Sequence, residues 1–183
     1  RGYGSFLNAG FHYAEQNGVP VVVAAGNARA DLDRNYYPNQ DDIMTHFPSL
    51  YATYCDTPST ICVSATGPTA GGTYTFGPWT DPDASATYTN YGRSAIDVAA
   101  PGGNYGASVI GACSGFSLLI PVCRTGTYVV GLGGTSMASP HVAGLAALLV
   151  EDLGRNPNRI KNHLQQSADD LGEPGTDPFY GKG

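Results

Sequence analysis

The sequence has little charge, and very little of that charge is lysine. Asp, Glu, Lys and Arg make up 13% of the 183 residues, about half of the roughly 25% that is usual in globular chains. Only two residues are lysines, no cluster of Lys or Arg occurs, and the net charge is −6. Because nucleic acids and anionic membranes bind to basic surfaces, we expect neither among the partners.

Long apolar runs are also missing. The longest, from Val142 to Val150, is interrupted by Gly144 and has about half of the 18 or more residues that indicate a membrane-spanning helix. Glycine and proline stay below the roughly 25–30% of residues that indicates a low-complexity chain. With 42% hydrophobic residues and a mass of 19.0 kDa, the chain can bury the core of one domain, and general disorder is excluded.

A zinc-site pattern is absent as well. The spacings between the four cysteines, Cys55, Cys62, Cys113 and Cys123, match no zinc motif. The simplest local pairing joins Cys55 to Cys62 and Cys113 to Cys123, which is one of three possible pairings. Four free buried thiols in a cytosolic protein are the alternative. Two disulfides, together with twelve tyrosines and few lysines, favour a secreted, extracellular protein.

The first part of the chain combines a helical and a strand-like pattern. Residues 5–17 are predicted to form a helix, with Ser5 as a possible N-cap and Gly18 in the position that ends it. The unbroken apolar run 19–25 predicts a strand buried on both faces. Such strands are typical of parallel sheets covered by helices.

The middle of the chain predicts short strands separated by long loops. Residues 61–66 and 96–100 have the length and composition of two further strands. Residues 107–112 and 127–132 are predicted to pair as a hairpin, which a bond between Cys113 and Cys123 would bridge. The other segments are rich in residues that favour loops.

The last part of the chain is predicted to be helical. Residues 135–153 are apolar on every face, which predicts a buried central helix that Gly154 ends. Asn156 as N-cap and Pro157 as first helical residue begin a final helix. The predicted fold is therefore α/β in one domain, a three-layer sandwich around a mostly parallel sheet.

Two segments carry residues suited to chemistry. Asn27 follows the strand-like run 19–25, at the end of the strand where open α/β sheets bind ligands. Ser136 opens the predicted buried helix, where unpaired backbone N–H groups and the positive end of the helix dipole favour a developing negative charge. A serine nucleophile beside an amide donor would suit the attack on a carbonyl and the stabilisation of its oxyanion.

Both segments resemble one known family. The eleven residues Gly134–Gly144 (GTSMASPHVAG) are similar to the serine signature of subtilisin-like serine proteases, the subtilases, and Val22–Asn27 (VVAAGN) resembles the family's oxyanion-asparagine segment. Tyr88–Gly92 and Ile96–Gly102 resemble stretches that lie between these two. The resemblance covers most of residues 5–183 and implies a subtilisin-like fold.

The resemblance implies a role for each matching residue. Ser136 would be the nucleophile of an endopeptidase, and its backbone N–H and the Asn27 side chain would be the oxyanion donors. Ala24, Ala25 and Gly26 would form one wall of the S1 pocket, which holds the side chain before the scissile bond of a polypeptide substrate. The chemistry would require no cofactor.

Two other side chains in the serine signature compete with this assignment. Ser139 lies one turn further into the helix, where its side chain should point away from the strand end. His141 looks like a catalytic base but lies in the helix body, and in the family the matching histidine is not the base. We therefore expect a buried structural role for His141.

The resemblance also raises the possibility of a structural calcium ion. Subtilases often bind calcium through backbone carbonyls of a Pro-Ser-x segment and an Asp on a neighbouring strand. Pro58, Thr60 and Asp97 match that pattern, and their oxygens suit Ca²⁺. The alternative is that Asp97 is a solvated residue at a strand end.

Two parts of the family's catalytic triad have no match in the sequence. The triad order is Asp, His, Ser, but no Asp precedes Asn27, and the only His there is His12 within the first predicted helix. We interpret residues 1–183 as the C-terminal portion of a subtilase catalytic domain, inactive alone, with the Asp- and His-bearing part as a possible partner. The alternatives are a non-catalytic peptide-binding module or a degenerate protease homologue. A lipase-type hydrolase is excluded because no G-x-S-x-G motif occurs.

Overall fold

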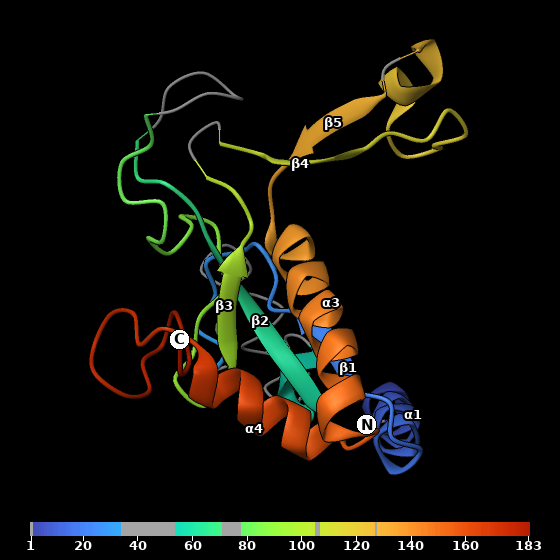
Figure 1. Ribbon diagram of the computed structural model, residues 1–183, viewed down its shortest axis with the longest axis vertical. Coiled ribbons are helices and arrows are strands. Elements are labelled where there is room, and N and C mark those ends of the chain that lie inside the picture. The colour runs from blue at the N-terminus through green and yellow to red at the C-terminus, as the bar shows by residue number, and fades with distance from the viewer. Residues whose placement is uncertain (1, 34–53, 71–77, 105–106, 127) are drawn as a thin grey trace.

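The centre of the molecule is a parallel β-sheet. The computed structural model describes residues 2–33, 54–70, 78–104, 107–126 and 128–183. Three strands pair in the order β1-β2-β3 (Figure 1), namely β1 (Val21–Ala24), β2 (Thr60–Thr66) and β3 (Val98–Pro101). Val22 lies opposite Ile61, and Val63 lies opposite Val98. The α/β architecture with a parallel sheet is confirmed, and the strands lie where the apolar runs predicted them.

Two helices cover one face of this sheet, α3 (Thr135–Leu153) and α4 (Pro157–Ser167) (Figure 1). Successive side chains of a strand point to opposite faces, and Ile61, Val63 and Ala65 of β2 point toward these helices. There they form the main core with residues that include Ala138, Val142, Ala146, Ile160 and Leu164. All residues of β2 are buried, as expected for a strand between two layers.

The opposite face of the sheet packs against loops and the short 3₁₀ helix η1 (Tyr54–Asp56). Its smaller core consists of Val23, Ala25, Leu32, Cys55, Cys62, Ala95 and Ile96. The disulfide between Cys55 and Cys62 ties η1 to β2, and the Ser64 hydroxyl donates to the Phe179 carbonyl at 2.5 Å. The predicted Cys55–Cys62 pairing is therefore present.

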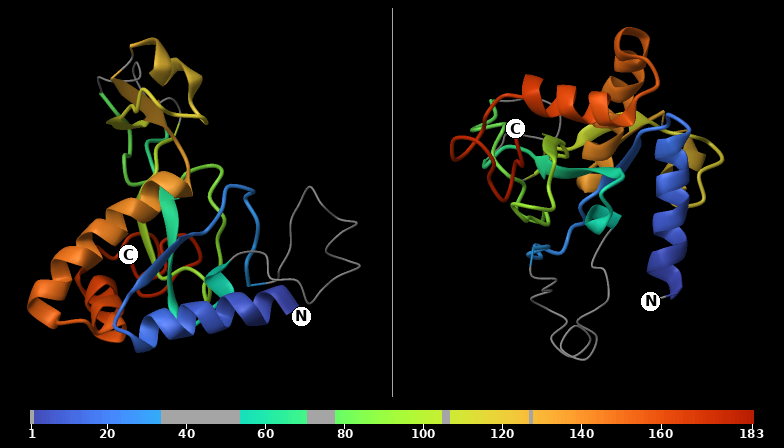
Figure 2. Two further views of the ribbon diagram at one scale, coloured as in Figure 1. Left: turned by 90° about the vertical axis from the view of Figure 1, so that its right-hand side faces the viewer. Right: turned by 90° about the horizontal axis from the view of Figure 1, so that it is seen from below.

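The first helix, α1 (Gly2–Gln16), lies beside the sheet, next to β1 and η1 (Figure 2). Its Phe11 ring packs edge to face on Tyr54, with 5.6 Å between ring centroids. Gly18 has φ of +73° and ends the helix as predicted, because glycine adopts the left-handed conformation at little energetic cost. The helix begins before Ser5, so the prediction of Ser5 as its N-cap is wrong.

The helix α3 has the predicted bounds, but it is not buried on every face. Its buried residues are Thr135, Ala138, Val142 and Ala146, which lie three or four positions apart and form one stripe. On the other side Leu145 is 47% exposed and Leu148 is 71% exposed. The expectation of a buried central helix therefore holds only for the face that touches the sheet.

A hairpin precedes α3 and projects from the rest of the structure (Figure 1). Its strands are β4 (Val109–Ala112) and β5 (Val129–Leu132), paired antiparallel. The disulfide between Cys113 and Cys123 closes it. The predicted hairpin and its cysteine pairing are both confirmed, and the alternative of four free thiols is wrong.

The signals that begin and end the last helices work as the sequence predicts. Gly154 ends α3 with φ of +71°, and its N–H bonds the Val150 carbonyl. The Asn156 side chain caps α4 by accepting from the Arg159 N–H at 3.1 Å. In the part of the chain that the structure describes, none of the helices has the length and apolarity needed to span a membrane.

Candidate functional site

The loop that follows β1 carries Asn27 and is held in place by a buried side chain, Asn90. The Asn90 Oδ1 atom accepts hydrogen bonds from the N–H groups of Ala28 and Ala30, both at 2.9 Å. Its Nδ2 atom donates to the Ala25 carbonyl at 2.8 Å. Asn90 is 1% exposed, so these bonds are shielded from water and determine the path of the loop on both sides of Asn27.

The Asn27 side chain lies at the N-terminus of α3. Its Oδ1 accepts from the backbone N–H of Thr135 at 2.9 Å and from the Thr135 hydroxyl at 3.0 Å. The Thr135 Oγ1 in turn accepts from the N–H of Gly26 at 3.0 Å. Because the residue before the helix, Gly134, has no side chain to cap it, Asn27 satisfies a helix N–H that would otherwise lack an acceptor.

Gly134 lies between the two segments, at a buried position where a side chain would be crowded. A Cβ atom there would lie 3.2 Å from Asn27 Nδ2 and 3.7 Å from the backbone N of Ser136. Gly134 also has φ of +146°, which a residue with a side chain adopts only with strain. Two nitrogen atoms from segments more than a hundred residues apart therefore lie close to Gly134, and a side chain at this position would crowd the nearer of them.

Ser136 itself is exposed to solvent. Ser136 is the second residue of α3, so its own N–H has no acceptor within the helix. The Ser136 backbone and the Asn27 side chain are thus both close to Gly134. The sequence predicted that Ser136 and Asn27 converge, and the structure brings them together.

His12 and His141 make their side-chain contacts elsewhere than at Ser136. His141 is five residues beyond Ser136 on α3, which places it on a different side of the helix. Its Nδ1 contacts the Met137 carbonyl at 2.8 Å, and the residue is exposed, so the expectation of burial is wrong. His12 lies on α1, where it contacts Glu15 at 3.2 Å and Gln16 at 3.0 Å.

Tyr88 supports the backbone beside Gly134. Its hydroxyl lies 2.9 Å from the carbonyl of Gly102 and 2.5 Å from that of Gly103, and Gly102 accepts from the Gly134 N–H at 2.8 Å. Burial raises the pKa of the Tyr88 hydroxyl, and a backbone hydrogen bond from Gly134 opposes this in part. The phenol therefore stays protonated and able to donate at neutral pH.

The three residues expected to line a substrate pocket lie just before Asn27. Ala24 ends β1 and is half-buried, whereas Ala25 is fully buried with its side chain in the smaller core. Gly26 is half-buried. Its N–H donates to the Thr135 hydroxyl oxygen, and its carbonyl accepts from the Asn90 N–H. Of these residues, Ala25 has no side-chain surface available to a ligand in the described structure.

Sequence reasoning missed Asn90 and Thr135, which organise the site. Both lie in segments that entered the family resemblance, but neither has a chemically reactive side chain. No local signal singles them out, because their burial, which obliges each polar side chain to find partners, is a property of the fold.

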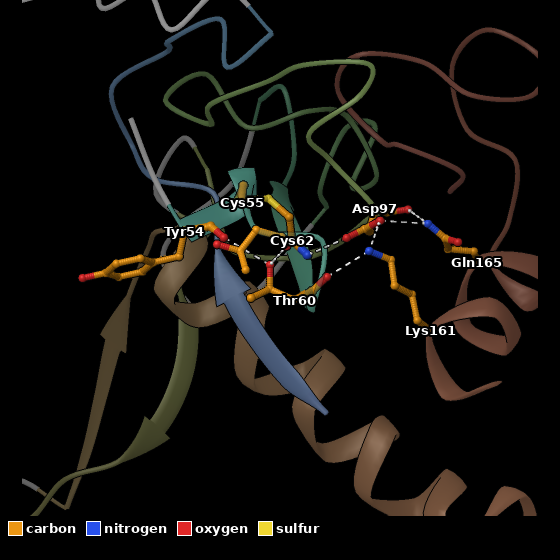
Figure 3. Close-up of polar contacts among 8 residues, drawn as sticks. Tyr54, Cys55, Thr60, Cys62, Asp97, Lys161 and Gln165 are labelled. Atoms are coloured by element: carbon orange, nitrogen blue, oxygen red, sulfur yellow. Dashed lines mark hydrogen bonds and ion pairs between the residues drawn. A yellow bond between two sulfur atoms is a disulfide. The ribbon is translucent and has the colours of Figure 1, made fainter. Parts of the chain in front are cut away.

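The residues expected to bind calcium do not surround a common site for an ion. Thr60 and Asp97 both contact the ammonium group of Lys161 (Figure 3). Pro58 is exposed. The part of the chain that the structure describes contains no group of three or more His, Cys, Asp or Glu side chains placed to hold a metal. The donor set does not fit calcium.

Comparison with known sequences identifies one family. The subtilase family model matches residues 2–183. A thermophilic serine proteinase of Bacillus sp. strain AK1 is 50% identical over 58 residues, which are 32% of this chain and 14% of that protein. Subtilisin Savinase of Lederbergia lenta is 44% identical over 62 residues, 32% of this chain and 21% of the relative.

Comparison with solved structures gives the same fold. A lanthipeptide protease has a TM-score of 0.69 at 23% identity, over 96% of this chain and 51% of that chain. A protease from Pseudoalteromonas arctica has a TM-score of 0.62 at 26% identity, over 96% of this chain and 43% of the other. The chain thus spans about half the length of these structures and a smaller part of the curated relatives.

Proposed function

The chain belongs to the subtilase family, and from this premise we propose that it is the C-terminal portion of a serine endopeptidase domain with Ser136 as nucleophile. The observation that carries the proposal is the nearness of Asn27 Nδ2 and the backbone N of Ser136, which lie 3.2 Å and 3.7 Å from the position that a Cβ atom of Gly134 would take. Such paired donors are what an oxyanion formed beside Ser136 requires.

The proposed reaction proceeds through an acyl-enzyme. The Ser136 Oγ attacks the carbonyl carbon of a peptide bond while a histidine base accepts the hydroxyl proton. The carbonyl oxygen becomes an oxyanion, held by Asn27 Nδ2 and the Ser136 N–H. The oxyanion collapses, the amine leaves with a proton from the histidine, and water then hydrolyses the ester at Ser136.

The base and its carboxylate partner come from a polypeptide segment other than the described residues. This is supported by the contacts of His12 and His141, which are with Glu15 and the Met137 carbonyl, and by the coverage of about half of a similar structure. The partner we propose is the Asp- and His-bearing part of the same catalytic domain. Residues 1–183 alone should then be inactive, because a serine hydroxyl without a base is a poor nucleophile.

The substrate we propose is an extended polypeptide. Ala24 and the backbone of Ala25 and Gly26 precede Asn27 and would contribute one wall of the S1 pocket, since they lie at the carboxyl end of β1. The buried side chain of Ala25 limits its contribution to backbone atoms. We also propose a secreted protein, because disulfides such as Cys55–Cys62 persist in oxidising compartments.

Hydrolysis of a fluorogenic peptide tests the proposal. In a polypeptide that joins the missing triad segment to residues 1–183, Ser136→Ala should abolish turnover. The matched control is Ser139→Ala in the same helix, which should leave turnover within a few-fold of the parent. Turnover that survives Ser136→Ala contradicts the assignment of the nucleophile. Turnover by residues 1–183 alone that Ser136→Ala abolishes contradicts the proposed need for a second segment.

A further inference from the structure

A lysine ammonium lies at the junction of β2, β3 and α4. The Nζ of Lys161 is 2.8 Å from Asp97 Oδ1 and 2.9 Å from the Thr60 carbonyl oxygen (Figure 3). The side chains of Lys161 and Asp97 are 24% and 15% exposed. This ion pair is therefore largely shielded from water, where a charge–charge contact is stronger than at an open surface.

The remaining capacity of the Asp97 carboxylate is also used. Its Oδ2 accepts from the Cys62 N–H at 2.8 Å, and its Oδ1 also accepts from Gln165 Nε2 at 3.0 Å. Both carboxylate oxygens thus have donors from the protein. Cys62 lies on β2 and Gln165 on α4, so the carboxylate joins these two elements as well.

The register of α4 explains why Lys161 reaches this point. Lys161 and Gln165 are one helical turn apart and lie on the same side of the helix. Their neighbours Ile160 and Leu164 are buried in the main core. The core contacts thereby fix the rotation of α4, and that rotation directs the adjacent Lys161 and Gln165 side chains toward Asp97.

The contacts of Thr60 and Asp97 are not those expected of a calcium site. Calcium takes about 6–8 oxygen ligands and favours several carboxylates, whereas Asp97 is the one carboxylate in the ion pair and Lys161 neutralises it. A divalent cation between Thr60 and Asp97 would be repelled by the positive charge of Lys161.

We propose that Lys161 is a built-in cation that replaces a metal ion at this junction, so that its stability does not depend on calcium. The ammonium group supplies the positive charge and the donors that hold the Thr60 carbonyl and the Asp97 carboxylate together. The covalent attachment of this cation to α4 keeps it in place when calcium is removed.

Two substitutions of Lys161 separate the charge from the space it fills. Lys161→Met keeps most of the side-chain volume without the charge, whereas Lys161→Ala also opens a cavity beside Asp97. Both should lower the thermal midpoint by about 5 °C, since an unpaired, shielded carboxylate is left. Millimolar CaCl₂ should restore several degrees to Lys161→Ala, because the opened space admits a cation that binds the folded state. It should restore little to Lys161→Met.

A substitution of the carboxylate itself decides whether the parent protein uses calcium here. Asp97→Asn should lower the midpoint, but the difference between midpoints in CaCl₂ and in EDTA should equal that of the parent. The matched control is Lys182→Ala, which removes the other, exposed lysine and should leave midpoint and calcium response unchanged. A parent calcium response that Asp97→Asn abolishes overturns the proposal, and so do Lys161 variants that are as stable as the parent. Failure of calcium to restore Lys161→Ala more than Lys161→Met also overturns it.

Discussion

The Asn27 side-chain oxygen accepts a hydrogen bond from the backbone N–H of Thr135 at 2.9 Å, across 108 positions of sequence. The Nδ2 atom of the same side chain lies 3.2 Å from the position that a Cβ atom of Gly134 would take. One amide group therefore has two separable tasks. Its oxygen caps α3, and its nitrogen is available as a donor next to Ser136.

Substitutions of Asn27 should separate these two tasks. Asn27→Asp keeps an acceptor for Thr135 but loses the Nδ2 donor, so we expect stability near that of the parent. The kcat should fall by about 10²–10³, the usual loss when one oxyanion donor is removed. Asn27→Ala should lose similar activity and also about 1 kcal/mol of unfolding free energy, because the cap is gone. Urea unfolding and peptide hydrolysis measure the two effects, and full activity of Asn27→Asp would contradict the donor role.

Thr135 is fully buried, and its hydroxyl links Gly26 to Asn27. Thr135→Val preserves the shape but leaves the Gly26 N–H without its acceptor. We expect a loss of about 1–3 kcal/mol in unfolding free energy, the usual cost of a buried unpaired donor. Thr135→Ser keeps the hydroxyl and is the matched control, with a smaller loss. Equal stability of the valine and serine variants would show that the hydroxyl contributes nothing.

Asn90 should affect activity although its side chain contacts the loop of Asn27 and not Ser136. Asn90→Ala removes three hydrogen bonds that hold the loop of Asn27, at a cost of about 3 kcal/mol if each contributes about 1 kcal/mol. In the active polypeptide we expect kcat to fall while the pH dependence of kcat stays unchanged, because no titrating group is lost. Asn8→Ala removes a single bond to the Thr57 hydroxyl and should leave kcat unchanged. A parent-like kcat for folded Asn90→Ala would contradict a positioning role.

Tyr88 should make the fold sensitive to strongly alkaline pH. Burial raises the pKa of its hydroxyl above the ordinary value of 10.0. Between that value and the raised one, the unfolded chain releases the proton while the folded chain retains it, so stability falls as pH rises. Tyr88→Phe should lack this part of the decline above pH 10, although it is less stable at pH 7 because the Gly102 and Gly103 carbonyls lose a donor. Parallel stability curves for parent and variant between pH 9 and 12 would be inconsistent with this account.

Local signals were sufficient for most of the secondary structure. Gly154 ends α3 and Asn156 caps α4 because backbone conformation and capping depend on neighbouring residues alone. The disulfide pairs were also predictable, since each closes a short loop. The expectation that Asn27 and Ser136 act together was specified by the family resemblance. Periodicity alone would not have placed two segments so far apart in the sequence at one site.

Other features depend on contacts between distant segments. The apolar composition of α3 predicted burial on all sides, but Leu148 and His141 are exposed because the described residues cover only one face of that helix. Asp97 had the right residue type for a metal site, yet its partner is Lys161, which the rotation of α4 against the core brings to it. Composition and spacing specify which elements form and where they end, because those choices are local. Which charge contacts Asp97, and which side chain holds the loop of Asn27, follows only from packing, because the contacts of the hydrophobic core determine how each helix is oriented and therefore which polar side chains face one another.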